Sequence, residues 1–262
     1  MSPAGTATRP SARPDRAWAE AWQASWDRQQ EGYMPDRELR FAALLDVVEA
    51  VAGPRPLVLD LACGTGSITR RLLDRFPGAR SIAVDIDPAL LTIAGATFAG
   101  DERVRIVRAD LASPDWTHAL PETPVDAVVT ATALHWIPEP MLRRLYRDLA
   151  GVVRPGGVAA NVDHMVTAEL PRLAVALRNV EERHRERQMA DGRPGWAAWW
   201  DLAAADPLLA EAVAERNARF PADHLEFDPP SQWHADALRD AGFAESGVTW
   251  RSGNEALVAA VR

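Results

Sequence analysis

Acidic side chains and glycines follow one another in a short stretch that could hold a small, partly anionic ligand. An apolar run contains Asp60, a loop of small residues with Gly64 and Gly66 follows, and helical spacing of apolar residues begins at Ile68. The glycines allow a sharp turn and a close ligand approach, and the N-terminus of the next helix favours a carboxylate or phosphate. The pattern predicts a strand, a ligand-binding turn and a helix at the carboxyl edge of a parallel sheet.

Two further acids end apolar runs downstream of this turn. Asp85 lies about 20 residues beyond the glycines, where a carboxylate can accept hydrogen bonds from both hydroxyls of a ribose. Asp87 is expected to cap the next helix, and Asp110 ends a third run. Each acid also has a structural interpretation, because Asp60 and Asp110 could hydrogen-bond their own turns and Asp85 could be a helix cap.

Three side chains are candidates for a general base or a substrate contact. His135 follows the apolar run 125–130, His164 follows Asp163 at the end of the next run, and Glu169 begins the segment after it. Asp163 and His164 are not expected to act as a dyad, because neighbours along a strand point to opposite faces. A structural hydrogen bond is an alternative role for His135.

Apolar runs that alternate with helical patterns must position these residues, and they predict an α/β fold. The expected strands are 58–61, 81–85, 104–111, 125–130 and one that begins at Val158, followed by a helix capped by Ser231 and two closing strands, 243–250 and 256–261. The expected parts are a disordered leader (1–15), a helical N-terminal cover (16–52), a core (53–164), a helical insertion (165–230) and a closing helix with strands (231–262).

The acid-led turn from Asp60 to Gly66 resembles the first motif of class I S-adenosylmethionine (SAM)-dependent methyltransferases, in which it holds the methionine part of the cofactor. The acids that end the second and third strands and the Arg-Pro-Gly-Gly stretch 154–157 follow in the family's order. The resemblance covers nearly all of residues 16–262. It implies a Rossmann-like, seven-stranded, mostly parallel sheet with helices on both faces, plus the N-terminal cover and an insertion after the fifth strand.

The same resemblance implies SAM as the cofactor and S-adenosylhomocysteine as its product. No metal ligands are assigned in the sequence, and whether a metal assists substrate binding stays open. In this family Asp110 would face the adenine amino group, and Tyr33 and Arg37 would close over the methionine carboxylate. An arginine would suit an acidic substrate equally well. The full set of expected cofactor contacts is Tyr33, Arg37, Asp60, Ala62, Gly64, Gly66, Asp85, Ile86, Asp110, Leu111 and Thr130.

The run 134–138 and the insertion resemble bacterial small-molecule enzymes that methylate carboxylates, phenols or carbon centres. Six of the ten tryptophans lie in the two added helical segments. They could line an apolar substrate cavity or simply pack the added segments against the core. We expect substrate contacts from Trp22, Trp26, Trp136 and Trp200. The predicted acceptor is a small hydrophobic, aromatic or isoprenoid metabolite of specialised metabolism, with the methylated atom left open.

Composition argues against several other classes. All 29 basic residues are arginine, so a P-loop lysine is missing, and Thr69 replaces the third glycine of the dinucleotide fingerprint. A single cysteine excludes an intramolecular disulfide and a multi-cysteine metal site. The net charge of −8 argues against a nucleic-acid partner, and no apolar run reaches the roughly 18 residues of a membrane span.

The N-terminus does not read as a secretory signal, so a cytoplasmic location is expected. The oligomeric state stays open. Alternatives to methyl transfer are a fold member that binds SAM for other chemistry such as cyclisation, a nicotinamide-dependent oxidoreductase, and an inactive binding protein.

Overall fold

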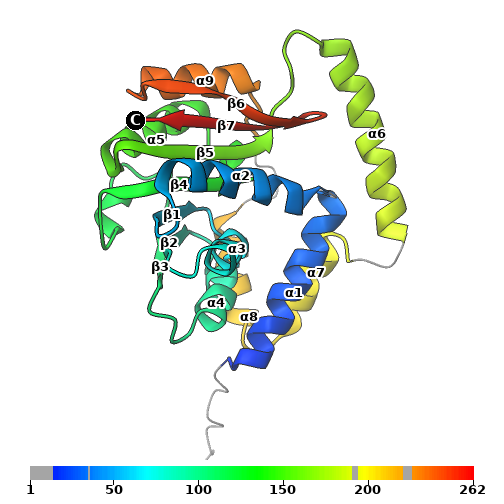
Figure 1. Cartoon of the computed structure of the whole chain (residues 1–262). Coiled ribbons are helices and arrows are strands. Elements are labelled where there is room, and N and C mark those ends of the chain that lie inside the picture. The colour runs from blue at the N-terminus through cyan, green and yellow to red at the C-terminus, as the bar shows by residue number, and fades with distance from the viewer. Residues whose placement is uncertain (1–13, 35, 191–193, 221–225) are drawn as a thin grey trace, which may run out of the picture.

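The computed structural model describes residues 14–34, 36–190, 194–220 and 226–262. Within them, seven strands form one sheet in the order β3-β2-β1-β4-β5-β7-β6, and β7 alone runs against its neighbours (Figure 1). The strands are β1 (Leu57–Leu61), β2 (Arg80–Asp85), β3 (Val104–Arg108), β4 (Val125–Ala131), β5 (Val153–His164), β6 (Glu245–Ser252) and β7 (Glu255–Val261). The predicted Rossmann-like, mostly parallel sheet is confirmed.

The helices fall into a core set and two added sets. The N-terminal cover is α1 (Arg16–Tyr33) and α2 (Arg37–Ala52), and the insertion after β5 is α6 (Pro171–Ala190), α7 (Trp196–Ala205) and α8 (Ala210–Arg219). The core helices are α3 (Ser67–Arg75), α4 (Pro88–Thr97), α5 (Glu139–Val152) and α9 (Ser231–Asp240), with short 3-10 turns at Trp116–Ala119 and Leu134–Trp136. Residues 1–13 of the predicted leader lie outside the described residues.

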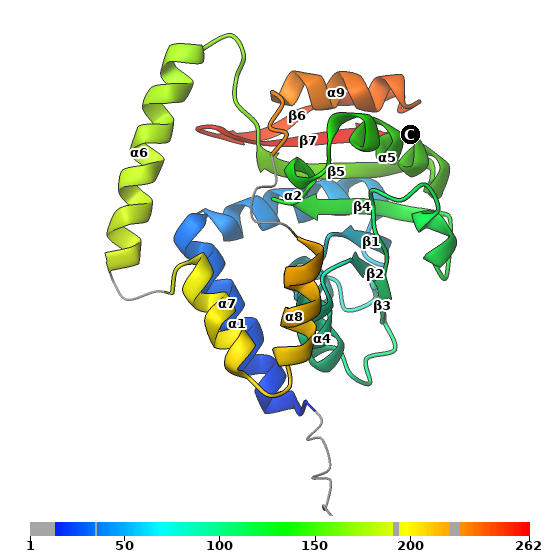
Figure 2. The same cartoon turned by 180° about the vertical axis from the view of Figure 1, so that it is seen from behind.

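Helices cover both faces of the sheet (Figures 1 and 2). On one face, Phe41 and Leu44 of α2 and Leu72 of α3 pack against the strands. On the other face, Leu145 of α5 and Leu238 of α9 do so. Every residue of β1 is buried, which explains why its apolar run shows no alternation of polar residues.

The strand order reverses between β1 and β4, and the backbone is strained at this point. Ala62 directly follows β1 with φ 52°, and Thr132 directly follows β4 with φ 50°. These are the two non-glycine residues with positive φ in the described part of the chain. Since open α/β sheets bind ligands at such switch points, and strain concentrates at functional sites, this edge is the candidate site.

Three boundaries differ from the sequence prediction. β5 begins at Val153, which pairs with Val125 before the Arg-Pro-Gly-Gly bulge, and not at Val158. The closing strands are displaced to 245–252 and 255–261. Pro230, not Ser231, occupies the N-cap of α9, and the Ser231 hydroxyl instead accepts a hydrogen bond from Arg251 at 2.5 Å.

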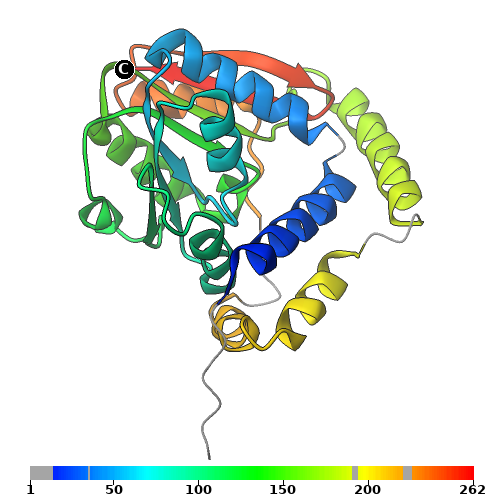
Figure 3. The same cartoon turned by 60° about the horizontal axis from the view of Figure 1, so that its bottom comes forward.

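Apart from α2, which packs on one face of the sheet, the added helices lie along its carboxyl edge. α1, α7 and α8 pack with α4 below that edge, while α6 stands further out (Figures 1 and 3). None of the helices in the described residues combines the length and apolar character that a membrane crossing needs.

Candidate active site

The glycine turn after β1 is held in place by the acid at the end of β2. Asp85 accepts a hydrogen bond from the Gly64 amide at 2.7 Å. Gly64 and Gly66 have φ of +57° and +82°, and a Cβ on Gly66 would lie 2.4 Å from the Phe98 ring. The turn therefore needs glycine at both positions, which leaves its backbone open to a ligand.

Asp60 stabilises this turn from inside the sheet. Its Oδ2 accepts hydrogen bonds from the backbone amide and the hydroxyl of Thr69, at 3.1 and 2.7 Å. The Thr69 hydroxyl also lies 2.7 Å from that of Ser81. Complete burial raises the pKa of Asp60 to about 7, and its Oδ1 has no partner. A third glycine at position 69 would keep the amide bond but remove both bonds of the hydroxyl, so here the Thr69 side chain serves the turn.

Asp85 presents an ordered carboxylate at the switch point. Its Oδ1 accepts hydrogen bonds from the Ile86 and Asp87 amides at 2.7 and 2.8 Å. Burial raises the pKa of Asp85 to about 6 despite these bonds. Each carboxylate oxygen has two acceptor sites, so Oδ1 is filled by these two amides, and Oδ2, which binds the Gly64 amide, keeps one site for a ribose hydroxyl.

The other predicted cofactor residues fall into two groups. Asp110 is partly exposed, accepts a hydrogen bond from the Ala112 amide at 2.9 Å, and lies 3.9 Å from the Arg219 guanidinium of α8. Leu111 and Thr130 are buried, and the Thr130 hydroxyl has no partner. Asp110 thus lies where α8 covers the end of β3, whereas Leu111 and Thr130 belong to the packed interior.

Tyr33 and Arg37 flank the junction of α1 and α2 but contact different surroundings. Arg37 is buried and donates to Asp27 at 2.7 Å, while its Nε has no partner. The Tyr33 hydroxyl accepts a hydrogen bond from the Trp196 amide at 2.8 Å, and the Arg185 guanidinium lies 5.4 Å from the Tyr33 ring.

His135 forms a dyad that the sequence reasoning missed. Its Nδ1 lies 2.8 Å from Asp163 Oδ1, and both side chains are buried. Burial lowers the pKa of His135, but the charge and hydrogen bond of Asp163, with the charges of Glu226 and Asp228, together outweigh burial, and the pKa is raised. The alternation along β5 already indicated that Asp163 points to the other face from His164, but not that it meets the turn after β4.

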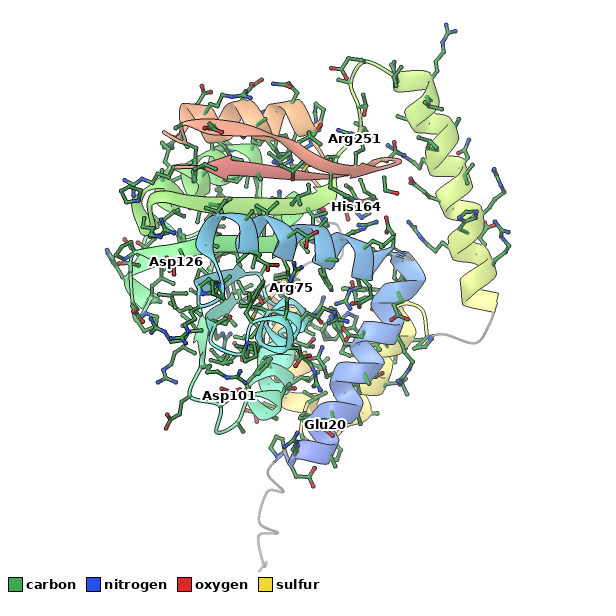
Figure 4. The ribbon with its side chains drawn as sticks, viewed as in Figure 1. Glu20, Arg75, Asp101, Asp126, His164 and Arg251 are labelled. Atoms are coloured by element: carbon green, nitrogen blue, oxygen red, sulfur yellow. The ribbon has the colours of Figure 1, made fainter. Side chains whose placement is uncertain are left out.

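His164 lies at the end of β5 that faces α6 (Figure 4). Its Nδ1 is 2.5 Å from Glu255 Oε1, and its ring centre is 5.8 Å from that of His135. Burial opposes protonation, but the bond to Glu255 and its charge raise the pKa of His164. Glu169 is exposed in the turn before α6.

A cavity of about 440 Å³ opens beside His164, between α6 and the sheet edge. Its walls come from α6, the α1–α2 junction, the β6–β7 hairpin and the segment before α9. The lining residues are Gly32, Tyr33, Asp36, Arg40, His164, Val166, Arg178, Glu181, His184, Arg185, Glu226, Asp228, Ser252, Gly253, Asn254 and Glu255. Its size suits a small molecule.

Three of the predicted substrate tryptophans, Trp22, Trp26 and Trp200, pack in one apolar cluster formed by α1, α4, α7 and α8. Nε1 of Trp22 donates to Asp206 at 2.9 Å. Trp136 lies elsewhere, in the turn after β4, and is 45% exposed. None of the four lines the cavity beside His164. Substrate contact stays a prediction for them.

The residues present fit SAM at the switch point. Asp85 offers an acceptor to a ribose, and the buried Arg37 Nε is a donor without a partner in the cluster that Asp27 joins to Ser67 of α3. When bound, SAM supplies a methyl group on a positively charged sulfur.

Comparisons with known proteins agree with this geometry. Residues 58–157 match the family model described as "Methyltransferase domain". The chain is 32% identical over 223 residues to a protein named trans-aconitate 2-methyltransferase from Methylobacterium radiotolerans, covering 83% of this chain and 73% of that protein.

Solved methyltransferases share the fold. An O-methyltransferase family protein from Burkholderia thailandensis superposes with a TM-score of 0.58 at 19% identity, over 95% of this chain and 63% of that chain. Human N-acetylserotonin methyltransferase in complex with SAM superposes with a TM-score of 0.54 at 14% identity, over 97% of this chain and 60% of that chain. This chain therefore spans less than two thirds of either solved protein.

Together these findings define a nucleotide-type site on a methyltransferase fold. The chain belongs to the class I SAM-dependent methyltransferases. The family, the enzyme class and the cofactor predicted from the glycine turn are confirmed.

Proposed function

We propose that this enzyme transfers a methyl group from SAM to a carboxylate oxygen of a small acid bound in the cavity under α6. The observation that carries the proposal is Arg185, which lines the cavity and whose buried Nε has no partner. A guanidinium with a free donor matches a carboxylate.

The cavity wall carries five carboxylates and three arginines, so the support for an acidic acceptor comes from the arginines that no carboxylate pairs with. Arg40 pairs with Asp36 and Glu255, both at 2.8 Å, so these three lining charges largely satisfy one another. Arg178 and Arg185 form no ion pair with any carboxylate in the described residues. The α6 wall therefore offers two cations to a ligand, opposite His164 and its neighbours.

The acceptor in the similar Methylobacterium protein, by that protein's name, is trans-aconitate. This acid carries several carboxylates, so one can be methylated while the others bind cations. A carboxylate is already ionised at neutral pH and needs no general base. The enzyme then has to hold the acceptor oxygen in line with the methyl group and exclude water.

The His135–Asp163 dyad has a role in this chemistry without proton abstraction. Since its pKa is raised, His135 keeps its proton to higher pH than an ordinary histidine. His135 does not line the cavity, but its ring centre is 5.8 Å from that of His164, which does. An imidazolium there adds a positive charge near an anionic acceptor and stabilises its position. A phenol acceptor would instead need His135 in its neutral form, as a base.

The experiment is a panel of acceptors incubated with purified enzyme and SAM. We expect methyl esters and equimolar S-adenosylhomocysteine with small di- and tricarboxylic acids, detected by mass spectrometry. Methylation of phenols or isoprenoids alone would contradict the acid proposal and support the hydrophobic acceptor predicted from the tryptophans. Specialised metabolism and a cytoplasmic location also stay predictions.

Arg185→Gln provides the matched test of the cavity. Loss of one charged contact should raise the KM for the acid about tenfold and leave affinity for S-adenosylhomocysteine unchanged. Arg183→Gln is the control, because Arg183 is exposed on α6 and does not line the cavity. Equal effects of the two substitutions would remove Arg185 from the acceptor site.

A further inference from the structure

A polar cluster joins α1 and α2 to the first turn of α3. Asp27 of α1 accepts hydrogen bonds from Arg37 at 2.7 Å, from the Ser67 hydroxyl at 2.8 Å and from Arg71 at 3.3 Å. Gln23, one turn before Asp27, donates to the same Ser67 hydroxyl at 3.0 Å. Ser67 is the first residue of α3 and directly follows the glycine turn, so the cluster borders the cofactor site.

Two atoms of this cluster are buried without a partner. They are Oε1 of Gln23, an acceptor, and Nε of Arg37, a donor. The side chains are almost completely buried, with 3% and 4% of their surfaces exposed. Folded proteins rarely leave such atoms unpaired, so an acceptor and a donor in one cluster next to the glycine turn indicate a missing pair of hydrogen bonds.

Charge in the cluster is balanced by Asp27. Burial raises the pKa of Asp27, but the charges of Arg37 and Arg71 outweigh burial and lower it, so the carboxylate is ionised. Because Asp27 binds Arg37 through Nη1 and Ser67 through its hydroxyl, it fixes both groups beside the turn. The cluster thus leaves two groups for a ligand, the positively charged donor of Arg37 and the neutral acceptor of Gln23.

The methionine end of SAM is an α-amino acid, with one carboxylate and one ammonium. We propose that Gln23 recognises this end, with Oε1 accepting from the ammonium while Arg37 Nε donates to the carboxylate. Asp27 is the positioning residue that orients Arg37 and, through Ser67, the Gln23 amide. The sequence suggested Arg37 alone, because nothing in its spacing separates Gln23 or Asp27 from surface residues of α1.

The test compares two ligands that differ only at this end. S-adenosylhomocysteine carries the amino-acid group, whereas 5′-methylthioadenosine ends in a methyl group. Calorimetric titration of the wild type with both ligands gives the ratio of the two dissociation constants. A purely structural cluster would not change this ratio, because both ligands share the adenosine part.

Gln23→Met keeps the size of the side chain but removes the acceptor. We expect affinity for S-adenosylhomocysteine to fall about tenfold, as for a lost hydrogen bond to a charged group, with affinity for methylthioadenosine unchanged. Gln23→Glu is not a rescue variant, because it loses the amide donor to Ser67 and places a second carboxylate next to Asp27, which lies 3.4 Å from the Gln23 amide nitrogen. Asp85→Ala, at the ribose end, should weaken both ligands.

Asp27→Asn gives a second, independent variant. By loosening Arg37 it should also weaken S-adenosylhomocysteine selectively. If Gln23→Met weakens both ligands equally, or neither, Gln23 serves only the packing of α1 on α3 and the proposal is wrong. Since methylthioadenosine binding reports a folded site, the outcome is readable even where stability falls.

Discussion

At the scale of single residues, paired acids define this site. Asp60 and Asp85 are both buried, and burial raises the pKa of each, to about 7 and about 6. Asp60 is bonded to Thr69 within the turn, while Asp85 bonds three backbone amides at the open edge. The two carboxylates thus have different roles. Asp60 stabilises the turn, and Asp85 is the predicted ligand contact.

His135 gives a pH prediction whose sign separates two mechanisms. Burial lowers the pKa of His135, whereas Asp163, Glu226 and Asp228 raise it. The result is a pKa above the ordinary value of 6.5. If the imidazolium holds an anionic acceptor, kcat/KM falls as pH rises through that raised pKa, because the cation is lost. If His135 is a general base, kcat/KM rises over the same range.

Asp163→Asn tests the dyad itself. Without the carboxylate, burial dominates and the pKa of His135 falls, so the descending limb should move to lower pH by about one unit or more. Initial rates with a small polycarboxylic acid between pH 5.5 and 9, set around the ordinary histidine value, measure this shift. A limb that stays in place would assign the pH dependence to another group, such as His164.

Residue types and spacing predicted the glycine turn and Asp85 correctly as parts of one edge. They could not predict the dyad, because Asp163 and His135 are 28 residues apart and meet only through the pairing of β4 with β5. The sequence also could not predict that Arg37 pairs with Asp27. Asp27 looks like a solvent-exposed acid of α1 in the sequence, and only the packing of α1 on α3 shows its contacts.

At the scale of elements, α6 is attached to the body at two places. Near its start, Asn254 of the β6–β7 hairpin donates to the Ala174 carbonyl at 3.0 Å and to Glu181 at 3.4 Å. Further along, Arg185 lies over the Tyr33 ring. The cavity lies beneath this span, so α6 acts as its outer wall.

Asn254→Ala should loosen that wall without disturbing the cofactor turn. We expect the KM for the acceptor to rise about fivefold to tenfold, the cost of one or two lost hydrogen bonds, with S-adenosylhomocysteine affinity unchanged. Hydrogen exchange should increase in residues 171–187. Faster exchange with an unaltered KM would show that α6 does not shape the acceptor site.

The sequence predicted that the added helices exist, but not where they pack. Periodicity indicated helices before and after the core, and the structure has them. Six tryptophans suggested an aromatic cavity, yet Trp22, Trp26 and Trp200 pack against one another and α4. Sequence cannot tell a buried aromatic cluster from a cavity lining, since both need the same residue types at the same helical spacing.

At the scale of the whole molecule, one sheet edge gathers both halves of the proposed reaction. The predicted cofactor residues Gly64, Asp85 and Asp110 lie at the ends of β1, β2 and β3, and the dyad and the cavity lie at the ends of β4 and β5. Parallel strands bring these ends together because their carboxyl ends share one edge. The predicted cofactor turn thus belongs to the core, while the proposed acceptor cavity takes one wall from the insertion.

The most direct test of the central claim is calorimetric titration with S-adenosylhomocysteine, on the wild type and on Asp85→Ala. We expect micromolar binding by the wild type and a loss of about tenfold or more in the variant, because the bonds to the ribose are removed. Undiminished binding by Asp85→Ala would contradict the site as placed here. No binding by the wild type would contradict the account as a whole.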